Sequence, residues 1–472
     1  MAPEGNRSMS LAKRTLPFLV VLLASPAARA DDTHYRDYPL GGRAVGLGGA
    51  FTGLADDPSG IYYNPAGLVD VKQGNVQIST NLYGFEVADT FLAAVDRVTD
   101  FDTVVTELNI IPSSASFTSS LHTDEATGRS ITTYGLGVFV PSYRNTSART
   151  VSDLMPIGGL PGCDRLAYQR TLLDRTFWFG GAIAHRLDDT WSVGASGFLA
   201  YRTLRDQEST TCSAGDASSS TTFATAETNL NLAVAALVLA FGIKADLGDG
   251  WTVGLTVTSP SIRAFDYADL RVTRTAADPV QGQSEFFQRE LDGLSANTKY
   301  GTGIRLGGAY VLERSSTFTA DLDFYAGTSY ELFRVPPDQG GVRDALTLTS
   351  RVERNPVLNL AVGAEHLLMP RLSVSGGLFT NFTSAPAIPG EVGDSFAVDH
   401  LPSVHAFGAA TVVGWFTEHT LTRIGLVMSY GDGSDVVPRY AGINALGAQT
   451  DFVKVDYSRL FAFAFVSSTV RF

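Results

Sequence analysis

GGRAVGLGGAFTGLADDPSGIYYNPAGL, residues 41–68, differs in composition from everything that follows it in the chain. Seven glycines fall between Gly41 and Gly60, and the stretch ends on Asn64-Pro65-Ala66-Gly67. Glycine adopts backbone angles that other residues avoid, and it allows two chains to approach closely. Pro65 lacks an N–H and restricts Asn64 to extended conformations. The stretch is therefore predicted to be a compact irregular segment, a plug that precedes a different kind of structure.

Residues 1–30 are typical of a secretory signal peptide. Lys13 and Arg14 precede the apolar run 16–24, and small residues follow at 28–30. The run is shorter than the roughly 20 apolar residues that a membrane-spanning helix needs, which disfavours a membrane anchor. The formal net charge of −13 becomes more negative when these residues are removed. An acidic exported chain is a poor partner for nucleic acid, and no nucleic-acid binding is predicted.

Strands separated by turns dominate the chain from residue 74 onward. The nearest approach to a membrane helix is Leu232–Ile243, whose twelve residues suit one long strand. No linker or composition break divides the chain, which favours one large barrel over several soluble domains. Fourteen segments have strand-like composition: Asn75–Glu86, Ser113–Leu121, Ile131–Tyr143, Leu173–Arg186, Trp191–Arg205, Asn229–Asp246, Trp251–Arg263, Ala296–Leu312, Thr317–Phe333, Ala345–Leu367, Arg371–Thr383, Ser403–Phe416, Leu421–Gly431 and Asp456–Phe472.

The links between these segments alternate in length. Short links are 187–190, 247–250, 313–316, 368–370 and 417–420, and long links are 144–172, 206–228, 334–344, 384–402 and 432–455. Period-2 alternation alone also fits a soluble β-sandwich, but a sandwich has no reason to keep this rhythm, whereas outer-membrane barrels have short inner turns and long outer loops. The predicted fold is all-β: a 14-stranded antiparallel transmembrane β-barrel with an N-terminal hatch inside its lumen. The predicted parts are a signal peptide (1–30), the hatch (31–73) and the barrel (74–472).

Aromatic residues support a membrane setting. Trp191 and Trp251 open strands directly after short turns, where an interfacial girdle is expected. The chain ends on Phe472, which resembles the C-terminal assembly signal of Gram-negative outer-membrane barrels. A partner is therefore predicted in the barrel-assembly machinery, which would recognise Phe472, although a terminal aromatic also arises by chance.

No constellation of catalytic or metal-binding residues stands out. The seven histidines are scattered without an HExxH pattern, two cysteines do not suffice for a thiolate metal site, and GxSxG is absent. No enzyme activity, cofactor or metal is predicted. Cys163 and Cys212 fall in consecutive long links on one side of the barrel, which favours a disulfide over two free thiols.

Asp56 and Asp57 lie in the segment predicted to be inside the barrel. Buried carboxylates need partners. Lumenal arginines such as Arg202 or Arg423, or backbone N–H groups at tight turns, are candidates, and a solvated turn is the alternative.

The stretch Arg43-Ala-Val-Gly46, Ala55-Asp-Asp-Pro58 and Asn64-Pro-Ala-Gly-Leu68 resembles the N-terminal hatch of the FadL family, outer-membrane transporters of long-chain fatty acids and aromatic hydrocarbons. Further resemblances lie in the barrel, in segments 134–141, 251–263 and 372–389. The resemblance implies a monomeric 14-stranded barrel whose lumen is closed by a hatch. In the family, an apolar ligand enters from outside and leaves sideways beside a kinked third strand.

Carried onto this chain, the resemblance assigns hatch and gating roles to Asn64, Pro65 and Ala66, and Asp56 and Asp57 are added from the same segment. Gly135 and Gly137 are the predicted kink-makers of the third strand, because glycine permits a bend, and close packing against the hatch is the alternative.

The predicted function is passive uptake of hydrophobic small molecules, long-chain fatty acids or aromatic hydrocarbons, across the Gram-negative outer membrane with lateral exit into the lipid. The alternative is a FadL-like barrel that serves in secretion or surface attachment and binds protein cargo. The predicted partners are the hydrophobic ligand, outer-membrane lipid and the assembly machinery.

Overall fold

The computed structural model describes residues 34–71, 74–94, 97–107, 111–153, 165–214, 222–278, 283–313, 315–339, 342, 351–390, 402–444 and 447–472. The predicted signal peptide lies outside these residues. The elements are α1 (Arg43–Gly46), α2 (Gly60–Tyr63), η1 (Pro65–Asp70), β1 (Asn75–Ala94), β2 (Arg97–Glu107), β3 (Ile111–Thr123), β4 (Ser130–Asp153), β5 (Arg165–Arg186), β6 (Trp191–Ala214), β7 (Thr222–Gly248), β8 (Trp251–Thr258), β9 (Ile262–Asp278), β10 (Gln283–Leu294), β11 (Gly303–Leu312), β12 (Ser316–Tyr325), β13 (Thr328–Glu331), β14 (Arg351–Arg354), β15 (Val357–Met369), β16 (Leu372–Asn381), β17 (Ser403–Phe416), β18 (Thr420–Asn444) and β19 (Gly447–Arg471).

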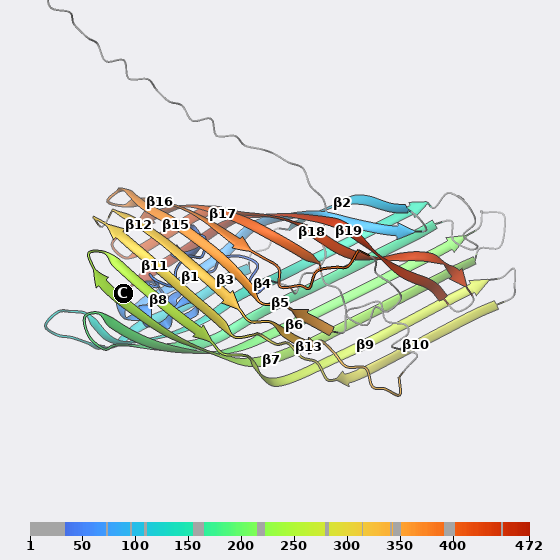
Figure 1. The fold of residues 1–472 in the computed structure, drawn as a ribbon, viewed down its shortest axis with the longest axis horizontal. Helices are drawn as coiled ribbons and strands as arrows, with labels where there is room; N and C mark the ends of the chain where they lie inside the picture. Colours follow the sequence, from blue (N-terminus) through green and yellow to red (C-terminus); the bar gives the residue numbers. More distant parts are fainter. Residues whose placement is uncertain are drawn as a thin grey trace, which may run out of the picture.

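The large sheet closes on itself as an antiparallel barrel (Figure 1). Six elements combine in three pairs, and each pair counts as one barrel strand. β2 and β3 both pair with β1, and β8 and β9 both pair with β7. β10 pairs with β9, and β11 pairs with β8. Closure comes from β19, which pairs with β1 from Asn75–Arg471 to Ala88–Arg459. The barrel therefore has 14 strands, which confirms the predicted count. Closure joins the first and last strands, so neither is left as a free edge along the described β1–β19 ladder, as a membrane-spanning sheet requires.

An apolar band surrounds the barrel next to the short turns. Its residues alternate with inward-facing ones, so that Leu237, Leu239, Phe241 and Ile243 of β7 are exposed while Gly242 and Lys244 point inward. In water this surface would be unstable, whereas in lipid it is the expected outer face of a barrel. Trp191 and Trp251 lie half-exposed at its edge, and Trp251 stacks on Tyr310 with 4.6 Å between ring centroids, as the predicted girdle requires. No helix in the described part of the chain is long and apolar enough to span a membrane.

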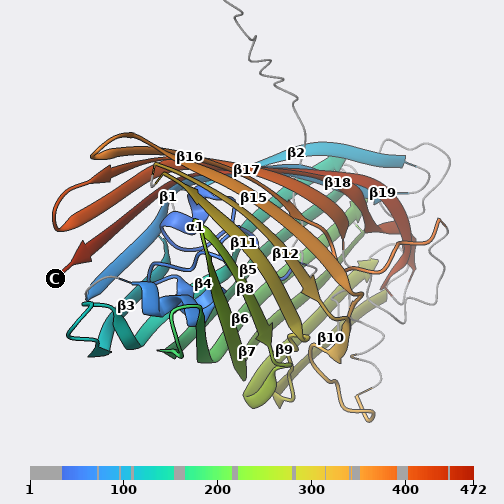
Figure 2. The same ribbon diagram turned by 60° about the vertical axis from the view of Figure 1, so that its left-hand side comes forward.

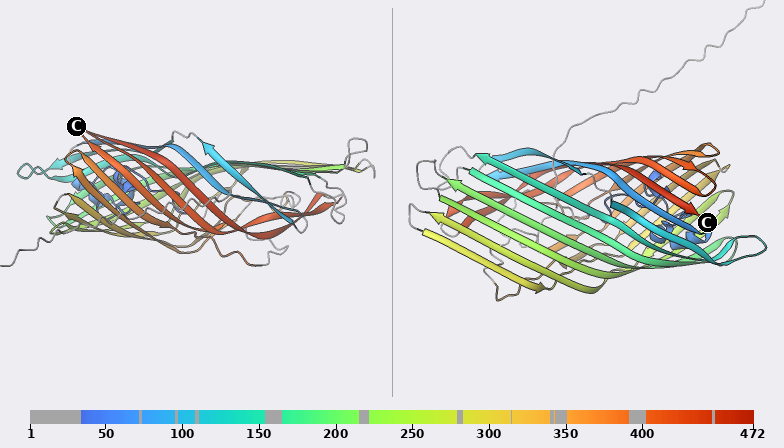
Figure 3. Two further views of the ribbon diagram at one scale, coloured as in Figure 1. Left: turned by 90° about the horizontal axis from the view of Figure 1, so that it is seen from above. Right: turned by 180° about the vertical axis from the view of Figure 1, so that it is seen from behind.

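Several strands continue far beyond this band (Figure 3). The long links 144–172 and 206–228 were predicted as loops, but much of each is strand, because β4 runs to Asp153, β5 starts at Arg165 and β6 runs to Ala214. The prediction failed because the outer face of these extensions is polar and their inner face mixes apolar and charged residues. On β6, Asp206 and Glu208 point inward while Arg205 and Gln207 point outward, so no apolar alternation marks the strand.

Residues 34–71, here called the lumen segment, lie inside the barrel (Figure 2). Its short helices contact opposite walls: η1 packs on β4 to β7, and α1 packs on β15 to β18. Large side chains of the segment, including Leu40, Leu47, Phe51, Ile61 and Tyr63, form an apolar core with side chains of the barrel wall. A second apolar cluster fills the lumen further out, between β5 to β10 and the two-stranded sheet β13–β14.

Candidate functional site

The lumen segment is almost entirely withdrawn from solvent. Every described residue in it is buried except Tyr35 and four charged residues, Arg43, Asp56, Asp57 and Asp70. An irregular chain can be buried only when its backbone polar groups find partners. The geometry of the site is therefore set by the groups on the barrel wall that bond this backbone.

Asn64 binds the segment to itself and to the wall. Its Oδ1 accepts from the N–H of Ala66 at 3.1 Å, which caps η1, and its Nδ2 donates to the carbonyls of Thr52 at 3.0 Å and Ile243 at 3.1 Å. Pro65 occupies the first position of η1, where its missing N–H is not needed. Asn64 is fully buried, so these three bonds replace all of its contacts with water. The predicted triplet Asn64-Pro65-Ala66 is thus a fixed point between the lumen segment and β7.

A seat of glycines on neighbouring strands receives this triplet. A Cβ atom at Gly242 would lie 2.1 Å from Asn64 Oδ1, and one at Gly194 would lie 2.5 Å from the carbonyl carbon of Pro65. Gly194 and Gly242 are register partners on β6 and β7. Only glycine allows the approach observed here.

The far end of the segment has a similar seat on the opposite wall. Gly377 of β16 lies so close that a Cβ there would be 2.1 Å from the nitrogen of Gly48. Between the two seats, Asp321 of β12 accepts from the N–H groups of Phe51 at 2.9 Å and Thr52 at 2.8 Å. The wall therefore bonds or closely contacts the segment on several sides.

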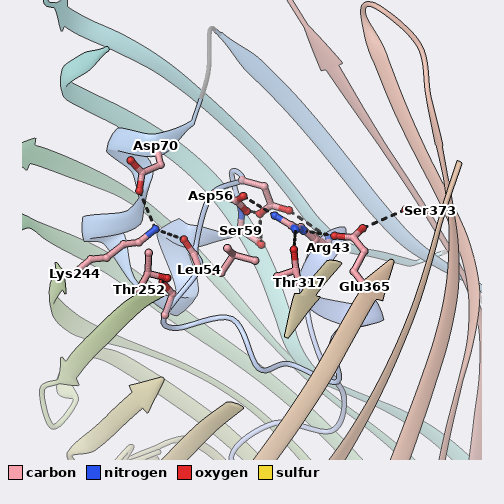
Figure 4. Close-up of polar contacts among 12 residues, drawn as sticks. Arg43, Leu54, Asp56, Ser59, Asp70, Lys244, Thr252, Thr317, Glu365 and Ser373 are labelled. Carbon is pink, nitrogen blue, oxygen red and sulfur yellow. Dashed lines mark hydrogen bonds and ion pairs between the residues drawn. The ribbon is translucent and has the colours of Figure 1, made fainter. Parts of the chain in front are cut away.

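Asp56 forms an anchor with Arg43 (Figure 4), and Asp57 joins it through the backbone N–H of Arg43. Arg43 donates to Asp56 at 2.5 Å and to Glu365 of β15 at 2.6 Å, so the arginine bridges the lumen segment and the barrel. Asp57 accepts from the backbone N–H groups of Ser59 and Arg43. The prediction that backbone N–H groups serve Asp57 is confirmed. Of the candidate arginines, Arg202 pairs with Asp174 and Arg423 with Glu365, and the charge beside Asp56 comes from Arg43 within the segment itself.

Asp70 forms a second anchor at the end of η1 (Figure 4). It accepts from Lys244 of β7 at 2.8 Å and from Arg186 of β5 at 2.6 Å, and Lys244 also donates to the carbonyl of Leu54. Burial opposes ionisation of Asp70, but the charges of Lys244 and Arg186 outweigh it and hold its pKa below the usual range.

A cavity of about 700 Å³ lies between the two anchors, at the short-turn end of the barrel. Its lining carries a cluster of charged groups, Asp56, Asp57, Asp70, Glu365 and Arg423, together with apolar residues such as Leu54 and Phe416. Such a surface suits water rather than an apolar ligand.

An aromatic cluster lies on the side of the lumen segment next to β4. Tyr62 meets Phe139 and Trp178, with ring centroids 5.5 and 5.6 Å apart, and Trp178 also contacts Phe198 and Tyr300. These pairs are tilted or edge-on, which are favourable arrangements of aromatic rings, and they form a continuous apolar, aromatic group beside β4.

The third strand, β4, breaks its regular pairing beside this cluster. Its register with β5 shifts between Phe139 and Ser142, and its ladder with β3 ends at the pair Ser114–Phe139 within the described residues. The N–H of Asp37 donates to the carbonyl of Pro141 at 2.9 Å, and the Asp37 carboxylate accepts from Ser142 Oγ at 2.8 Å. The lumen segment thus holds the irregular part of β4.

The kink predicted at Gly135 and Gly137 was misplaced. Both glycines keep regular register with β3 and β5, whereas the shift includes Pro141, which has no N–H to donate to a ladder. Gly135 instead gives room to the lumen segment, because a Cβ there would lie 2.7 Å from Ile61 Cδ1. Gly137 gives room to the ring of Phe139, at 2.8 Å.

No protein-family model matches the chain, and no curated protein matches its sequence. Solved structures do match its fold. A Pseudomonas aeruginosa FadL homologue superimposes with a TM-score of 0.56 at 12% identity, covering 93% of this chain and 100% of the homologue. The Pseudomonas putida toluene transporter TodX gives 0.55 at 13%, with 92% and 99% covered, and the CymD monoaromatic hydrocarbon channel gives 0.51 at 12%, with 92% and 98% covered.

The chain has the FadL fold. The resemblance seen in the sequence is confirmed at this level, and the fold is that of an outer-membrane β-barrel. The aromatic cluster and the break in β4 are formed by this chain's own residues. The sequence identity of this chain to each reported structure is too low for the ligand of that structure to be assigned to it.

Sequence reasoning missed several residues that hold the lumen segment. Asp321, Lys244 and Glu365 are single inward-facing charges on strands, and nothing in their local sequence separates them from other lumenal charges. One signal was available: Lys244 lies two residues after Gly242, so a small residue and a charge share one face of the strand.

Cys212 is disulfide-bonded. It lies within β6 rather than in a loop, paired with Leu166 of β5, so its predicted loop position was wrong. Cys163 lies outside the described residues, and the Cys163–Cys212 bond remains a prediction. Within the described ranges, no three His, Cys, Asp or Glu residues cluster as metal ligands.

Proposed function

We propose that the chain is a passive outer-membrane channel for hydrophobic small molecules, which leave its lumen sideways into the lipid. The observation that carries this proposal is the break in β4 directly beside the aromatic cluster. An apolar molecule held by Phe139 and Trp178 would be next to the one place on this wall where the described β3–β4 ladder stops. The named neighbours, a toluene transporter and a monoaromatic hydrocarbon channel, agree with this class of ligand.

Sideways release suits such a ligand energetically. Each CH₂ group gains roughly 0.8 kcal/mol on leaving water for lipid. A straight path to the short-turn end would instead lead into the polar cavity between Glu365 and Asp70. The lateral route needs no source of energy and no chemical reaction.

The charges above the aromatic cluster favour a ligand with a carboxylate, such as a long-chain fatty acid, over a neutral aromatic hydrocarbon. Arg144 lies on β4 just beyond the break and is only 3% exposed. Its Nη2 is 3.5 Å from Asp37, while its Nε and Nη1 have no hydrogen-bond partner among the described residues. A buried guanidinium with free donors is destabilising unless a partner arrives. A carboxylate accepts two such N–H groups at once.

In this function the lumen segment acts as the hatch, and residues 31–73 form its domain. Asn64, Pro65 and Ala66 hold it on one wall, and Asp56 and Asp57 hold it through Arg43 on the other. Phe472 would present the assembly signal: it is two-thirds exposed on the outer face of the last strand, and its ring stacks on Phe117. The barrel closes with its own strands, which is compatible with a monomer.

The test compares uptake of two ligands by cells that lack other uptake routes. The variant is Arg144→Gln, and the matched control is Arg205→Gln, whose guanidinium is on the outer face and bonds Asn231 at 3.0 Å. A charged hydrogen bond contributes about 1.5–3 kcal/mol, so Arg144→Gln should weaken half-saturation by a long-chain fatty acid roughly 10- to 100-fold. Uptake of toluene should change less than about twofold.

Equal loss for both ligands would show that Arg144 supports the structure rather than the carboxylate. Unchanged uptake of both would remove Arg144 from the ligand path. No uptake of either ligand by the wild-type barrel, together with stoichiometric recovery of a bound protein, would favour the cargo-binding alternative.

A further inference from the structure

One wall of the barrel faces the lumen segment with hydroxyl groups that bond nothing in the described protein. Ser114, Ser116 and Thr118 of β3 and Thr133 of β4 are at most 6% exposed, and none of their hydroxyls has a hydrogen-bond partner among the described residues. A buried polar group without a partner is destabilising by about 1–3 kcal/mol. Four such hydroxyl groups in one patch indicate a common cause and not four separate packing defects.

These hydroxyls form rows with their neighbours on β1 and β19. Ser116 is the register partner of Gln77, and Gln77 is the partner of Thr469. One row higher, Ser114, Ser79 and Ser467 align in the same way. Gln77 is fully buried, and its Oε1 also has no partner among the described residues. The surface is therefore a continuous polar strip on the inner face of β19, β1 and β3.

Two strands further round the barrel, β6 and β8, use the same residue types differently. Ser196 donates to the carbonyl of Ile61 at 2.8 Å, Ser192 donates to that of Ala66 at 3.1 Å, and Thr252 donates to that of Gly53 at 2.8 Å. Hydroxyls there hold the lumen segment. Since the hydroxyls on β3 do not hold it, packing of the segment alone does not explain them.

The lower end of the strip opens into the polar cavity. Thr469 lines that cavity, and Gln77 donates both to Thr469 at 3.2 Å and to the cavity residue Asp57 at 3.1 Å. The upper end is Ser114, whose register partner on β4 is Phe139, the last pair before the β3–β4 ladder stops. From Thr118 to Ser114 the strip rises about 13 Å.

We infer that a file of bound water runs along this strip, from the cavity at the short-turn end to the base of the break in β4. Water satisfies buried hydroxyls that protein groups do not reach, and it needs polar partners on several sides, which the rows supply. On the proposed function, the file would hydrate the polar end of an amphiphile that reaches Phe139.

The test uses no transported ligand, so it fails or succeeds independently of the proposed function. Ser116→Cys places a thiol on β3 and Ser196→Cys places one on β6, and both sites are buried. Purified protein in nanodiscs is exposed to silver ion, which is close to water in size and binds thiols. The protein is then unfolded, and unblocked thiols are counted with a maleimide by mass spectrometry. The wild-type protein, in which Cys212 is disulfide-bonded, is the blank.

Silver should block Ser116→Cys at least tenfold faster than Ser196→Cys. Equal rates for the two thiols, or protection of both, would overturn the inference. If Ser116→Cys does not assemble, the pair Ser114→Cys and Ser192→Cys makes the same comparison on the same strands, with the same two outcomes.

Discussion

A single methyl group on the inner face of β16 should loosen the lumen segment. Gly377 faces the segment, and a Cβ there would lie 2.1 Å from the nitrogen of Gly48 and 2.3 Å from the carbonyl carbon of Leu47. Its neighbour Gly376 points the other way, and a Cβ there would meet only the carbonyl of Ala410 at 3.8 Å. Gly377→Ala and Gly376→Ala are therefore the same change one residue apart on opposite faces of one strand.

The expected magnitude follows from this clash. The backbone at Gly48 must retreat by about 1.3 Å to restore ordinary contact with the methyl group of Gly377→Ala. Overpacking of this kind typically costs about 1–3 kcal/mol. If the strain is relieved by undocking, the undocked population of the lumen segment rises about 5- to 150-fold, because each 1.4 kcal/mol is a factor of ten.

Limited trypsin digestion of the folded barrel measures this population. Arg36 and Arg43 are cleavage sites inside the segment, and cleavage there tracks the opened fraction when opening and closing are fast. Mass spectrometry of the N-terminal fragment distinguishes these cuts from cuts in outer loops, and heat-dependent migration on a gel checks that the barrel is intact. Equal cleavage of Gly377→Ala and Gly376→Ala, at the wild-type rate or above it, would show that close contact at Gly377 does not hold the lumen segment in place.

Three further predictions use the same protease assay. Asn64→Ala removes three buried hydrogen bonds, about 2–4 kcal/mol, and should speed cleavage more than tenfold with the barrel still folded; a wild-type rate would contradict its role as a fixed point. Arg43→Met leaves Glu365 with a weakened set of partners and also removes one trypsin site, so cleavage is followed at Arg36 alone; adding Glu365→Gln should slow that cleavage again, and additive effects of the two changes on it would show that the pair does not couple. Ionised Asp70 stabilises docking of the lumen segment at neutral pH, because its pKa is lowered. Protection of the segment, measured with an acid-active protease in place of trypsin, should therefore persist on acidification until the pH falls through that lowered pKa. Loss of protection already near pH 6 would contradict this anchor.

The barrel could be predicted from sequence wherever lipid touches it. In β7, Leu237, Leu239 and Phe241 alternate with inward-facing residues, because one face meets hydrocarbon and the other does not. Outside the lipid this contrast disappears, as it does around Asp206 on β6. The strand count was therefore correct, although the outer ends of the strands were not found.

The site could be predicted from sequence only where its residues are consecutive in the chain. Asn64-Pro65-Ala66 was found because proline and glycine mark it locally. Its partners on the wall, Gly242 and Ile243, come from a strand more than 170 residues away, and their roles exist only once the barrel closes. The break in β4 was misplaced for a related reason: glycine marks where a strand can bend, whereas the actual shift depends on Pro141 and on the bond that Asp37 makes to it.

The central claim is that hydrophobic molecules cross this barrel without an energy source and pass the break in β4. The most direct measurement is the initial rate of uptake of a radiolabelled long-chain fatty acid by de-energised cells that lack other uptake routes. Cells with the wild-type barrel are compared with cells carrying a variant whose β4 lacks Val140 and Pro141, at equal amounts of folded barrel. Saturable uptake is expected with the wild-type barrel, and at least a tenfold loss with the shortened β4. Equal uptake in both cells would contradict the central claim.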